Sequence, residues 1–348
     1  MTATKWLTGK SSLIGLSPMD GITDCAFRST QSNFAKPDFM FTEFVSAEGL
    51  VKGGVKLYDL LLFRSAQRPL IGQIFGKDPE SFYKATVVLC HLGFDGIDLN
   101  FGCPAKTVTQ HGGGAALIGT PDLALSLAKA SQRAISDWVG GKVTLVDLGL
   151  NQRTLDVISR NLKFSGPPPS PIHPTFSIKT RLGLAESVLT TWIPQLLDLL
   201  PDFITLHGRT LKQGYSGQAD WDSIHLAAGL THNEGVPLIG NGDISSLGQA
   251  RQYQSKYSVD GVLIGRAALG NPWVFSDTVP TWSDRFQALK YHMSEFQAAF
   301  PLRRLDPLRR VMLEYTKSHP HAKALRLKIV AISKPEDFLT LESEFVQA

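Results

Sequence analysis

The sequence is poor in cysteine, and this limits the chemistry that it can carry. Its 348 residues include only Cys25, Cys90 and Cys103, and no two of them form a Cys-x-x-Cys pair. An odd number of widely spaced cysteines argues against a disulfide framework and against a structural zinc site. We therefore expect no bound metal, and a reducing compartment such as the cytoplasm.

Long apolar runs and charge of one sign are also scarce. No run of about 18 apolar residues occurs, so we expect no membrane-spanning helix. The first residues, MTATKWLTGKSS, lack the apolar stretch of a signal peptide. The net charge is only +4, but residues 281–334 hold eleven Lys or Arg against four Asp or Glu. This segment could bind a polyanion, although a solvated helical surface would look the same.

The sequence does contain one recurring pattern: a short apolar run, then a polar or glycine-rich turn, then a helical stretch. The Ile, Leu, Val and Phe content of the runs is typical of buried parallel strands. Two of the helical stretches begin with an N-cap residue followed by proline, at Asp78-Pro79 and Thr120-Pro121. Eight such units predict an α/β fold, a (β/α)8 TIM barrel. The runs span residues 12–19, 39–45, 69–76, 96–102, 175–183, 203–209, 237–243 and 261–267.

Two segments depart from this rhythm. Residues 140–174, between the fourth helix and the fifth strand, contain a proline cluster at 167–171 that favours an extended stretch, and we interpret them as a surface insertion. After Trp273 the apolar residues take helical spacing, which predicts a small helical bundle. We therefore expect a catalytic barrel domain, residues 1–280, and a helical domain, residues 281–348.

Polar side chains follow all eight runs. In a barrel the carboxyl ends of the strands meet at one mouth, so these side chains predict a large polar ligand there. The glycine-rich turns IGNGD and LIGRAALGNPW follow the last two runs, where barrels often bind phosphate. Arg266 would add charge-assisted hydrogen bonds to it. The strand-end residues are Pro18, Met19, Asp20, Glu43, Gln73, Asn100, Cys103, Lys179, Arg181, His207, Arg209, Asn241, Gly242, Asp243, Gly265 and Arg266.

Lys179 lies on a predicted strand, on the same face as Ser177 and Arg181. A cation that faces the interior of a barrel is costly unless it meets an anion. A reduced flavin is such an anion, and an adjacent lysine would stabilise it. An ion pair with Glu43 or Asp243 would also explain this lysine.

Cys103 differs from the other two cysteines in its surroundings. Cys25 and Cys90 lie in helical segments, as small buried residues do. Cys103 instead begins the loop GCPAKTVTQHGGGAAL after the fourth run. A cysteine in such a loop can act as a general acid.

Eight sequence motifs, taken together, resemble those of the tRNA-dihydrouridine synthases. They are most similar to the motifs of the bacterial B and C types. The resemblance runs in order through residues 13–275, and the helical tail agrees with that family's C-terminal domain. The chain departs from the family in the length of segment 140–174 and at Ala267, where many members have glycine. The matching segments are LSPMDGITDCAFR, TEFVSAEGL, LNFGCPAKTV, GGGAAL, IKTRLG, LHGRT, NGDI and IGRAALGNPW.

The resemblance implies reduction of specific D-loop uridines of tRNA to 5,6-dihydrouridine by a monomer that binds FMN and uses NADPH, or NADH, as reductant. Hydride would pass from FMN N5 to uracil C6, and Cys103 would protonate C5. Asn100 and Arg181 would face the target uridine, and the helical domain would bind the tRNA. The FMN contacts would be Pro18, Met19 and Asp20 in the first loop, Gln73 at the ring edge, Lys179 near N1 and O2, His207, and Asn241, Gly242, Asp243, Gly265 and Arg266 at the phosphate end.

Two other functions fit part of the pattern. An FMN barrel oxidoreductase acting on a free small pyrimidine, like dihydroorotate dehydrogenase, would share the phosphate site and the lysine. It would have no use for a basic tail. A non-catalytic RNA-binding barrel would have no use for Cys103 and Lys179.

Overall fold

The structure, a computed structural model, describes Leu7 and residues 12–166, 173–332 and 335–346. Eight parallel strands close into a barrel in which each strand pairs with its neighbours in sequence, and β8 pairs with β1. The predicted (β/α)8 fold is confirmed, and each of the eight predicted runs coincides with one strand, β2 extending one residue beyond its run. The strands are β1 (Leu13–Leu16), β2 (Phe39–Ser46), β3 (Leu70–Phe75), β4 (Gly96–Phe101), β5 (Thr175–Arg181), β6 (Phe203–His207), β7 (Leu238–Asn241) and β8 (Gly261–Ile264).

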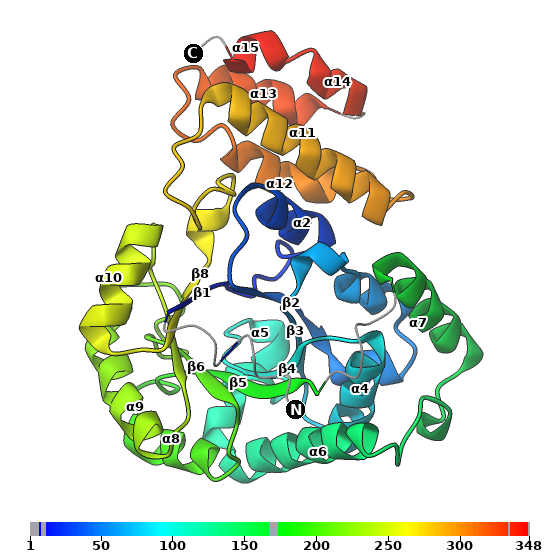
Figure 1. The fold of residues 1–348 in the computed structure, drawn as a ribbon, viewed down its shortest axis with the longest axis vertical. Helices are drawn as coiled ribbons and strands as arrows, with labels where there is room; N and C mark the ends of the chain where they lie inside the picture. The colour runs from blue at the N-terminus through cyan, green and yellow to red at the C-terminus, as the bar shows by residue number, and fades with distance from the viewer. Residues whose placement is uncertain (1–6, 8–11, 167–172, 333–334, 347–348) are drawn as a thin grey trace.

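Helices surround the barrel (Figure 1). Helix α4 (Pro79–Leu92) begins as predicted, with the Asp78 side chain accepting a hydrogen bond from the Ser81 N–H. Helix α6 (Pro121–Val139) also begins at its proline, but the Thr120 side chain makes no capping hydrogen bond. In the described parts of the chain, no helix combines the length and the apolar character needed to cross a membrane. The other barrel helices are α2 (Cys25–Phe34), α3 (Ala47–Val51), α5 (Lys106–Thr109), α7 (Gln152–Ser165), α8 (Leu189–Leu197), α9 (Trp221–Asn233) and α10 (Leu247–Tyr257), with 3-10 turns η1 (Val55–Leu61), η2 (Ser65–Gln67), η3 (Gly114–Gly119), η4 (Val146–Leu148) and η5 (Arg266–Ala268).

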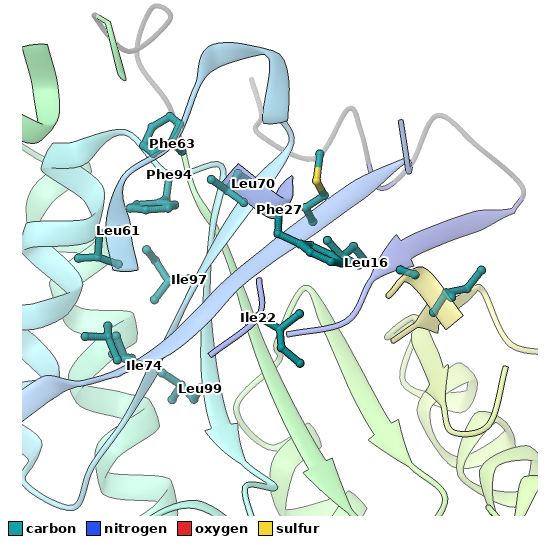
Figure 2. Packing of buried hydrophobic residues seen from close by; sticks show 14 of the residues in the cluster. Leu16, Ile22, Phe27, Leu61, Phe63, Leu70, Ile74, Phe94, Ile97 and Leu99 are labelled. Carbon is teal, nitrogen blue, oxygen red and sulfur yellow. The ribbon is translucent and has the colours of Figure 1, made fainter. Parts of the chain in front are cut away.

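Alternation along each strand sends one set of side chains to the helices and the other into the barrel. Figure 2 shows Ile97 and Leu99 of β4 packed with Leu70 and Ile74 of β3 in the helix-facing core. The intervening Asp98 of β4 points into the barrel instead, where it meets Gln73 of β3.

The barrel interior has an apolar layer at the end where the strands begin. These side chains form a cluster of their own, separate from the helix-facing core. They fill the interior, as in other barrels of this size. The layer consists of Leu13, Phe39, Phe41, Ile71, Phe203, Ile239 and Leu263, together with Leu7.

Segment 140–174 contains a helix that was not predicted. Helix α7 is capped by Asn151, whose side chain accepts a hydrogen bond from the Thr154 N–H, and its buried residues include Val157, Ile158 and Asn161. Asn161 Nδ2 donates to the carbonyl of Tyr58 in η1 at 2.6 Å. The proline cluster at 167–171 lies outside the described residues.

The C-terminal tail is helical, as predicted, and it is docked on the barrel. Its long helix α11 packs along α2 (Figure 1). Phe27 and Phe34 of α2 contact the His292 and Tyr291 rings at 5.8 and 5.9 Å, and Phe34 also contacts Trp273 at 5.1 Å. The tail helices are α11 (Trp282–Ala299), α12 (Asp306–Glu314), α13 (Ala322–Ala331), α14 (Pro335–Leu339) and α15 (Glu342–Val346).

Candidate active site

A chain of hydrogen bonds crosses the carboxyl ends of β3, β4 and β5 and ends at the backbone of Cys103. Ser177 Oγ and Gln73 Nε2 donate to the two oxygens of Asp98 at 2.6 and 2.7 Å. Asn100 Nδ2 donates to Gln73 Oε1 at 3.0 Å. Asn100 Oδ1 then accepts the Cys103 N–H at 2.8 Å. Since all of these side chains are buried, this series of hydrogen bonds fixes the position of the Cys103 backbone.

Asp98 determines which groups donate and which accept in this series of hydrogen bonds. Burial raises the pKa of Asp98 to about 6, against the hydrogen bonds from Ser177 and Gln73 and the charge of Lys179, so the carboxyl is ionised at neutral pH. An ionised carboxylate only accepts hydrogen bonds, and Gln73 must therefore present its amide nitrogen to it. This leaves the oxygen of Gln73 for Asn100, and the oxygen of Asn100 for the loop after β4.

Cys103 is a free thiol that is only 6% exposed. Burial raises the pKa of the Cys103 thiol above its usual value, although the Ala105 N–H and the charges of Arg181 and Lys179 act against it. The group is therefore a protonated thiol at neutral pH. This state suits a proton donor better than a nucleophile, which must be a thiolate.

Lys179 has an ammonium that makes no hydrogen bond or ion pair among the described residues. Burial, followed by the charge of Arg181, lowers its pKa to about 8, with Asp98 and Cys103 opposing the shift. It remains largely charged at pH 7 and faces the mouth with unmet donors.

The two ion pairs that could have explained Lys179 are absent from the described residues. Glu43 is buried and its carboxylate accepts the Gly21 N–H of the first loop. Asp243 forms ion pairs with Arg209 and Arg266. The ion-pair explanation is therefore wrong for both carboxylates.

Arg181 holds two loops together. Its Nε donates to the Gly102 carbonyl at 2.6 Å, and its Nη1 donates to the carbonyls of Thr210 and Gly214 at 3.3 and 3.2 Å. The side chain is 2% exposed. The guanidinium predicted to face the substrate thus also ties the loop after β4 to the loop after β6.

His207 is a neutral histidine with a defined tautomer. Burial first, and then the charges of Lys179, Arg181, Arg209 and Arg266, lower its pKa far below the ordinary value. Arg209 Nη1 lies 3.3 Å from His207 Nε2, and because arginine only donates, Nε2 accepts and Nδ1 carries the proton. His207 can therefore donate a hydrogen bond at the mouth without bringing a charge.

The ends of β7 and β8 form a strained, cationic turn. Gly242 has φ +141°, and a Cβ added there would lie 2.4 Å from the Ala219 Cβ, so only glycine fits. Asp243 has φ +56°, a costly conformation for a non-glycine residue. The Nη2 atoms of Arg209 and Arg266 bind the two oxygens of the Asp243 carboxylate at 2.6 and 2.8 Å and stabilise this conformation.

The same turn presents backbone donors. In the described parts of the chain, the N–H groups of Gly242, Asp243 and Arg266 find no protein acceptor. Burial raises the pKa of Asp243, but the hydrogen bonds from Arg209 and Ala219 and the arginine charges outweigh it, so the pKa falls below its ordinary value. The negative charge of Asp243 is thus neutralised by the two arginines.

The first loop closes the remaining side of the mouth. Pro18 and Met19 are half-buried and Asp20 is exposed. A Cβ added at Gly265 would lie 3.6 Å from the Met19 Sδ, so the loops after β1 and β8 are adjacent. Asn241 Nδ2 donates to the Leu263 carbonyl at 3.4 Å, which joins β7 to β8. The strand-end residues named from the sequence therefore surround one mouth.

Asp98 is the residue of this site that sequence reasoning missed. It lies inside the run GIDLNF, whose apolar residues alternate with Asp98 and Asn100. That alternation signals a polar face on a strand, and it could have identified the residue. In the described residues, no three His, Cys, Asp or Glu side chains gather in a way that could hold a metal.

The family model and the relatives found by sequence point to one family. The family model described as dihydrouridine synthase (Dus) matches residues 15–160 and 173–348, and the internal unmatched stretch, 161–172, falls within segment 140–174. A probable tRNA-dihydrouridine synthase of Staphylococcus aureus (strain MRSA252) is 29% identical over 340 residues, 95% of this chain and 92% of the relative. One of Aquifex aeolicus (strain VF5) is 30% identical over 263 residues, 75% of this chain and 71% of the relative.

A solved structure of DHODH in complex with ferulenol, from Eimeria tenella, has a TM-score of 0.47 and 13% identity over 75% of this chain and 78% of that one. A TM-score and an identity this low carry no information about function. The family model covers nearly the whole chain, and the site described above lies within its matched residues. The chain belongs to the dihydrouridine synthase family.

Proposed function

We propose that the protein reduces uridines of tRNA to 5,6-dihydrouridine with a bound flavin, FMN, and that NADPH restores the reduced flavin. The observation that carries the proposal is a protonated, rigidly held Cys103 in the same barrel mouth as the unpaired cation Lys179. Family membership supports the reaction, since the relatives are named for it.

The residues at the mouth fit FMN at both ends of the cofactor. The unpaired ammonium of Lys179 suits the anionic edge of a reduced flavin ring. The free N–H groups of Gly242, Asp243 and Arg266, together with the half-exposed Arg266 guanidinium, suit a phosphate. The remaining contacts would come from Pro18, Met19, Asp20, Gln73, His207, Asn241 and Gly265.

When bound and reduced, FMN supplies a hydride for C6 of the uracil. Cys103 supplies the matching proton to C5, so that one hydride and one proton saturate the C5–C6 bond. The Asp98–Gln73–Asn100 chain orients the backbone that carries the thiol. The nearby charges of Arg181 and Lys179 favour the thiolate that remains, which is then reprotonated from water.

The remaining parts of the proposal concern the whole molecule. We assign residues 1–280 to catalysis and the tail, 281–348, to tRNA binding, because the tail holds most of the excess positive charge. Asn100 and Arg181 are assigned to the uridine. We also propose a monomer that acts in the cytoplasm, where its three free thiols stay reduced.

The test is to incubate the purified, FMN-loaded protein with NADPH and unmodified tRNA, and to map dihydrouridine by mass spectrometry of nuclease fragments. Product at a D-loop position supports the proposal and identifies the target uridine. A parallel reaction with NADH compares the two reductants. If no tRNA yields product while a free pyrimidine substrate turns over, the protein is a small-pyrimidine oxidoreductase instead.

A further inference from the structure

Three parts of the chain meet in a surface that the proposed chemistry does not use. Asp59 of η1 accepts a hydrogen bond from Arg160 of α7 at 2.8 Å and another from Arg303, in the loop between α11 and α12, at 2.6 Å. One carboxylate therefore joins the barrel wall, the helix of segment 140–174 and the tail. Figure 1 shows α7 and the α11–α12 end of the tail on the same flank of the molecule.

A second set of contacts joins the same three parts. Arg64, between η1 and η2, lies with its guanidinium 4.2 Å from the centre of the Phe164 ring of α7. The same side chain forms an ion pair with Glu295 of α11 at 3.4 Å. Two independent connections between the same elements make this flank one surface rather than three separate ones.

Exposed cations line this surface, and we name it the cationic ridge. In the 3-10 turn η1, Lys56 stands three residues before Asp59 and thus projects from the same side. On α7, Arg153 and Arg160 are seven residues apart and share one face. All of the ridge cations are exposed in the described structure. The ridge consists of Lys52, Lys56, Arg153, Arg160, Lys163, Arg303 and Arg304.

The ridge keeps a positive excess after its internal pairs are counted. The acids next to these cations are Asp59, Asp78, Asp156 and Asp306; Asp306 pairs with Arg304 at 3.2 Å, and the charge of Lys52 acts on Asp78. Seven cations against four acids leave a surplus of three positive charges. A merely solvated face would mix the two signs evenly, whereas cations outnumber acids on this one.

The ridge reaches the rim of the mouth. The charge of Arg303 acts on Asp24, the residue that caps α2 directly after the first mouth loop. At the other end, Lys52 follows α3, and a Cβ on the adjacent Gly53 would lie 2.7 Å from Asn151 Nδ2 at the start of α7. The ridge therefore borders the segments that follow β1 and β2 at the mouth.

We propose that the cationic ridge binds the sugar–phosphate backbone of the tRNA, in a stretch next to the one that enters the mouth. This inference rests on the proposed function, because it takes tRNA as the polyanion. Lysine and arginine at a surface without exposed aromatic rings contact phosphates and do not read bases. The ridge therefore adds affinity and orientation, but no sequence preference.

The test compares two double variants of the FMN-loaded protein by filter binding of unmodified tRNA across a salt series. Lys56→Ala/Arg153→Ala removes two ridge charges and leaves the Asp59 contacts intact. Lys129→Ala/Lys142→Ala removes two exposed charges from the region of α6, which lies across the barrel from the tail (Figure 1). The ridge variant should bind tRNA about 5- to 20-fold more weakly, with a shallower dependence of log Kd on log salt by about 1 to 2. The control variant should match the wild type.

Turnover separates this inference from the proposed function. In the ridge variant KM for tRNA should rise while kcat, FMN content and melting temperature stay at wild-type values. Wild-type affinity and salt dependence in the ridge variant would overturn the inference. If the wild type forms no dihydrouridine in any tRNA, the proposed function fails. The binding comparison, which needs no turnover, still decides whether the ridge binds RNA.

Discussion

The two ends of the barrel interior are built from the same eight strands, yet they carry opposite chemistry. At the end where the strands begin, seven strand side chains and Leu7 form a closed apolar layer. Further along the strands, Gln73, Asp98 and Lys179 bring hydrogen-bonding groups and charge into the interior. Strand alternation decides which residues face the barrel interior. The position of such a residue along the barrel axis then decides whether it contributes to stability or to chemistry.

The largest expected effect at the polar end comes from removing its proposed proton donor. Cys103→Ala should lower turnover by about 10²- to 10⁴-fold, the usual contribution of a positioned general acid. FMN content and tRNA affinity should stay at wild-type values, because the side chain is small and its hydrogen bond runs through the backbone. Single-turnover kinetics with pre-reduced enzyme measure the effect.

Cys90→Ala is the matched control, since Cys90 is equally buried but lies on α4, away from the mouth. It should affect stability and leave turnover unchanged. Undiminished turnover in Cys103→Ala would remove this thiol from the mechanism.

At the apolar end, Phe203→Ala should act only on stability. Phe203 is fully buried and contacts Phe39 at 6.3 Å between ring centres. Its truncation should cost about 3–5 kcal/mol in the free energy of unfolding. Urea denaturation measures the loss, and kcat at a temperature where the variant is folded should be unchanged. A large fall in kcat of the folded variant would mean that the two layers are not independent.

Replacing Lys179 with methionine should have opposite effects on binding and on stability. FMN affinity should fall about 10- to 100-fold, because the flavin loses its cation. The apoprotein should melt at the same temperature or higher, because an unpaired, largely buried charge is removed. Fluorescence titration with FMN and thermal melting of the apoprotein measure the two effects. A destabilised apoprotein with unchanged FMN affinity would show that Lys179 has a structural role.

Asp98 should give stability a pH dependence that develops only as its carboxyl titrates. Its folded pKa of about 6 exceeds the usual value near 4, so between these two pH values the folded state holds more protons than the unfolded state. Stability from this group is therefore present below about pH 4 and is lost as pH rises through 6. A shift of about two pKa units corresponds to a loss of about 3 kcal/mol in the free energy of unfolding.

Asp98→Asn should remove this loss, so the difference in stability between variant and wild type should grow from pH 4 to pH 7. Denaturant titrations at pH 4, 5, 6 and 7 measure it. Parallel pH profiles for the two proteins would mean that the carboxyl of Asp98 does not titrate in this range.

Sequence alone predicted the barrel because its signals are local. Each buried strand is a short apolar run, and two helix starts carry an N-cap residue followed by proline, so eight units could be counted without knowing any contact. The strand ends of a barrel converge whatever the details, and this placed Cys103, Lys179 and His207 in one mouth.

The pairing of charges could not be predicted, because it depends on distances across the barrel. Glu43 and Asp243 were both plausible partners for Lys179. Glu43 instead accepts the Gly21 N–H, and Asp243 pairs with two arginines. The pairing of β2 with β3 also shifts register between Phe41 and Phe44, which no local pattern reveals.

The docking of α11 on α2 has a consequence for how the chain can be recombined. Helix α2 begins directly after the first mouth loop, and its outer face supplies Phe27 and Phe34 to the tail. A tail grafted from a relative would meet these rings with foreign side chains. The unit that can be exchanged between members of the family is therefore the tail together with the outer face of α2, and a chimaera cut at the apparent domain boundary alone would leave a mismatched seam beside the mouth.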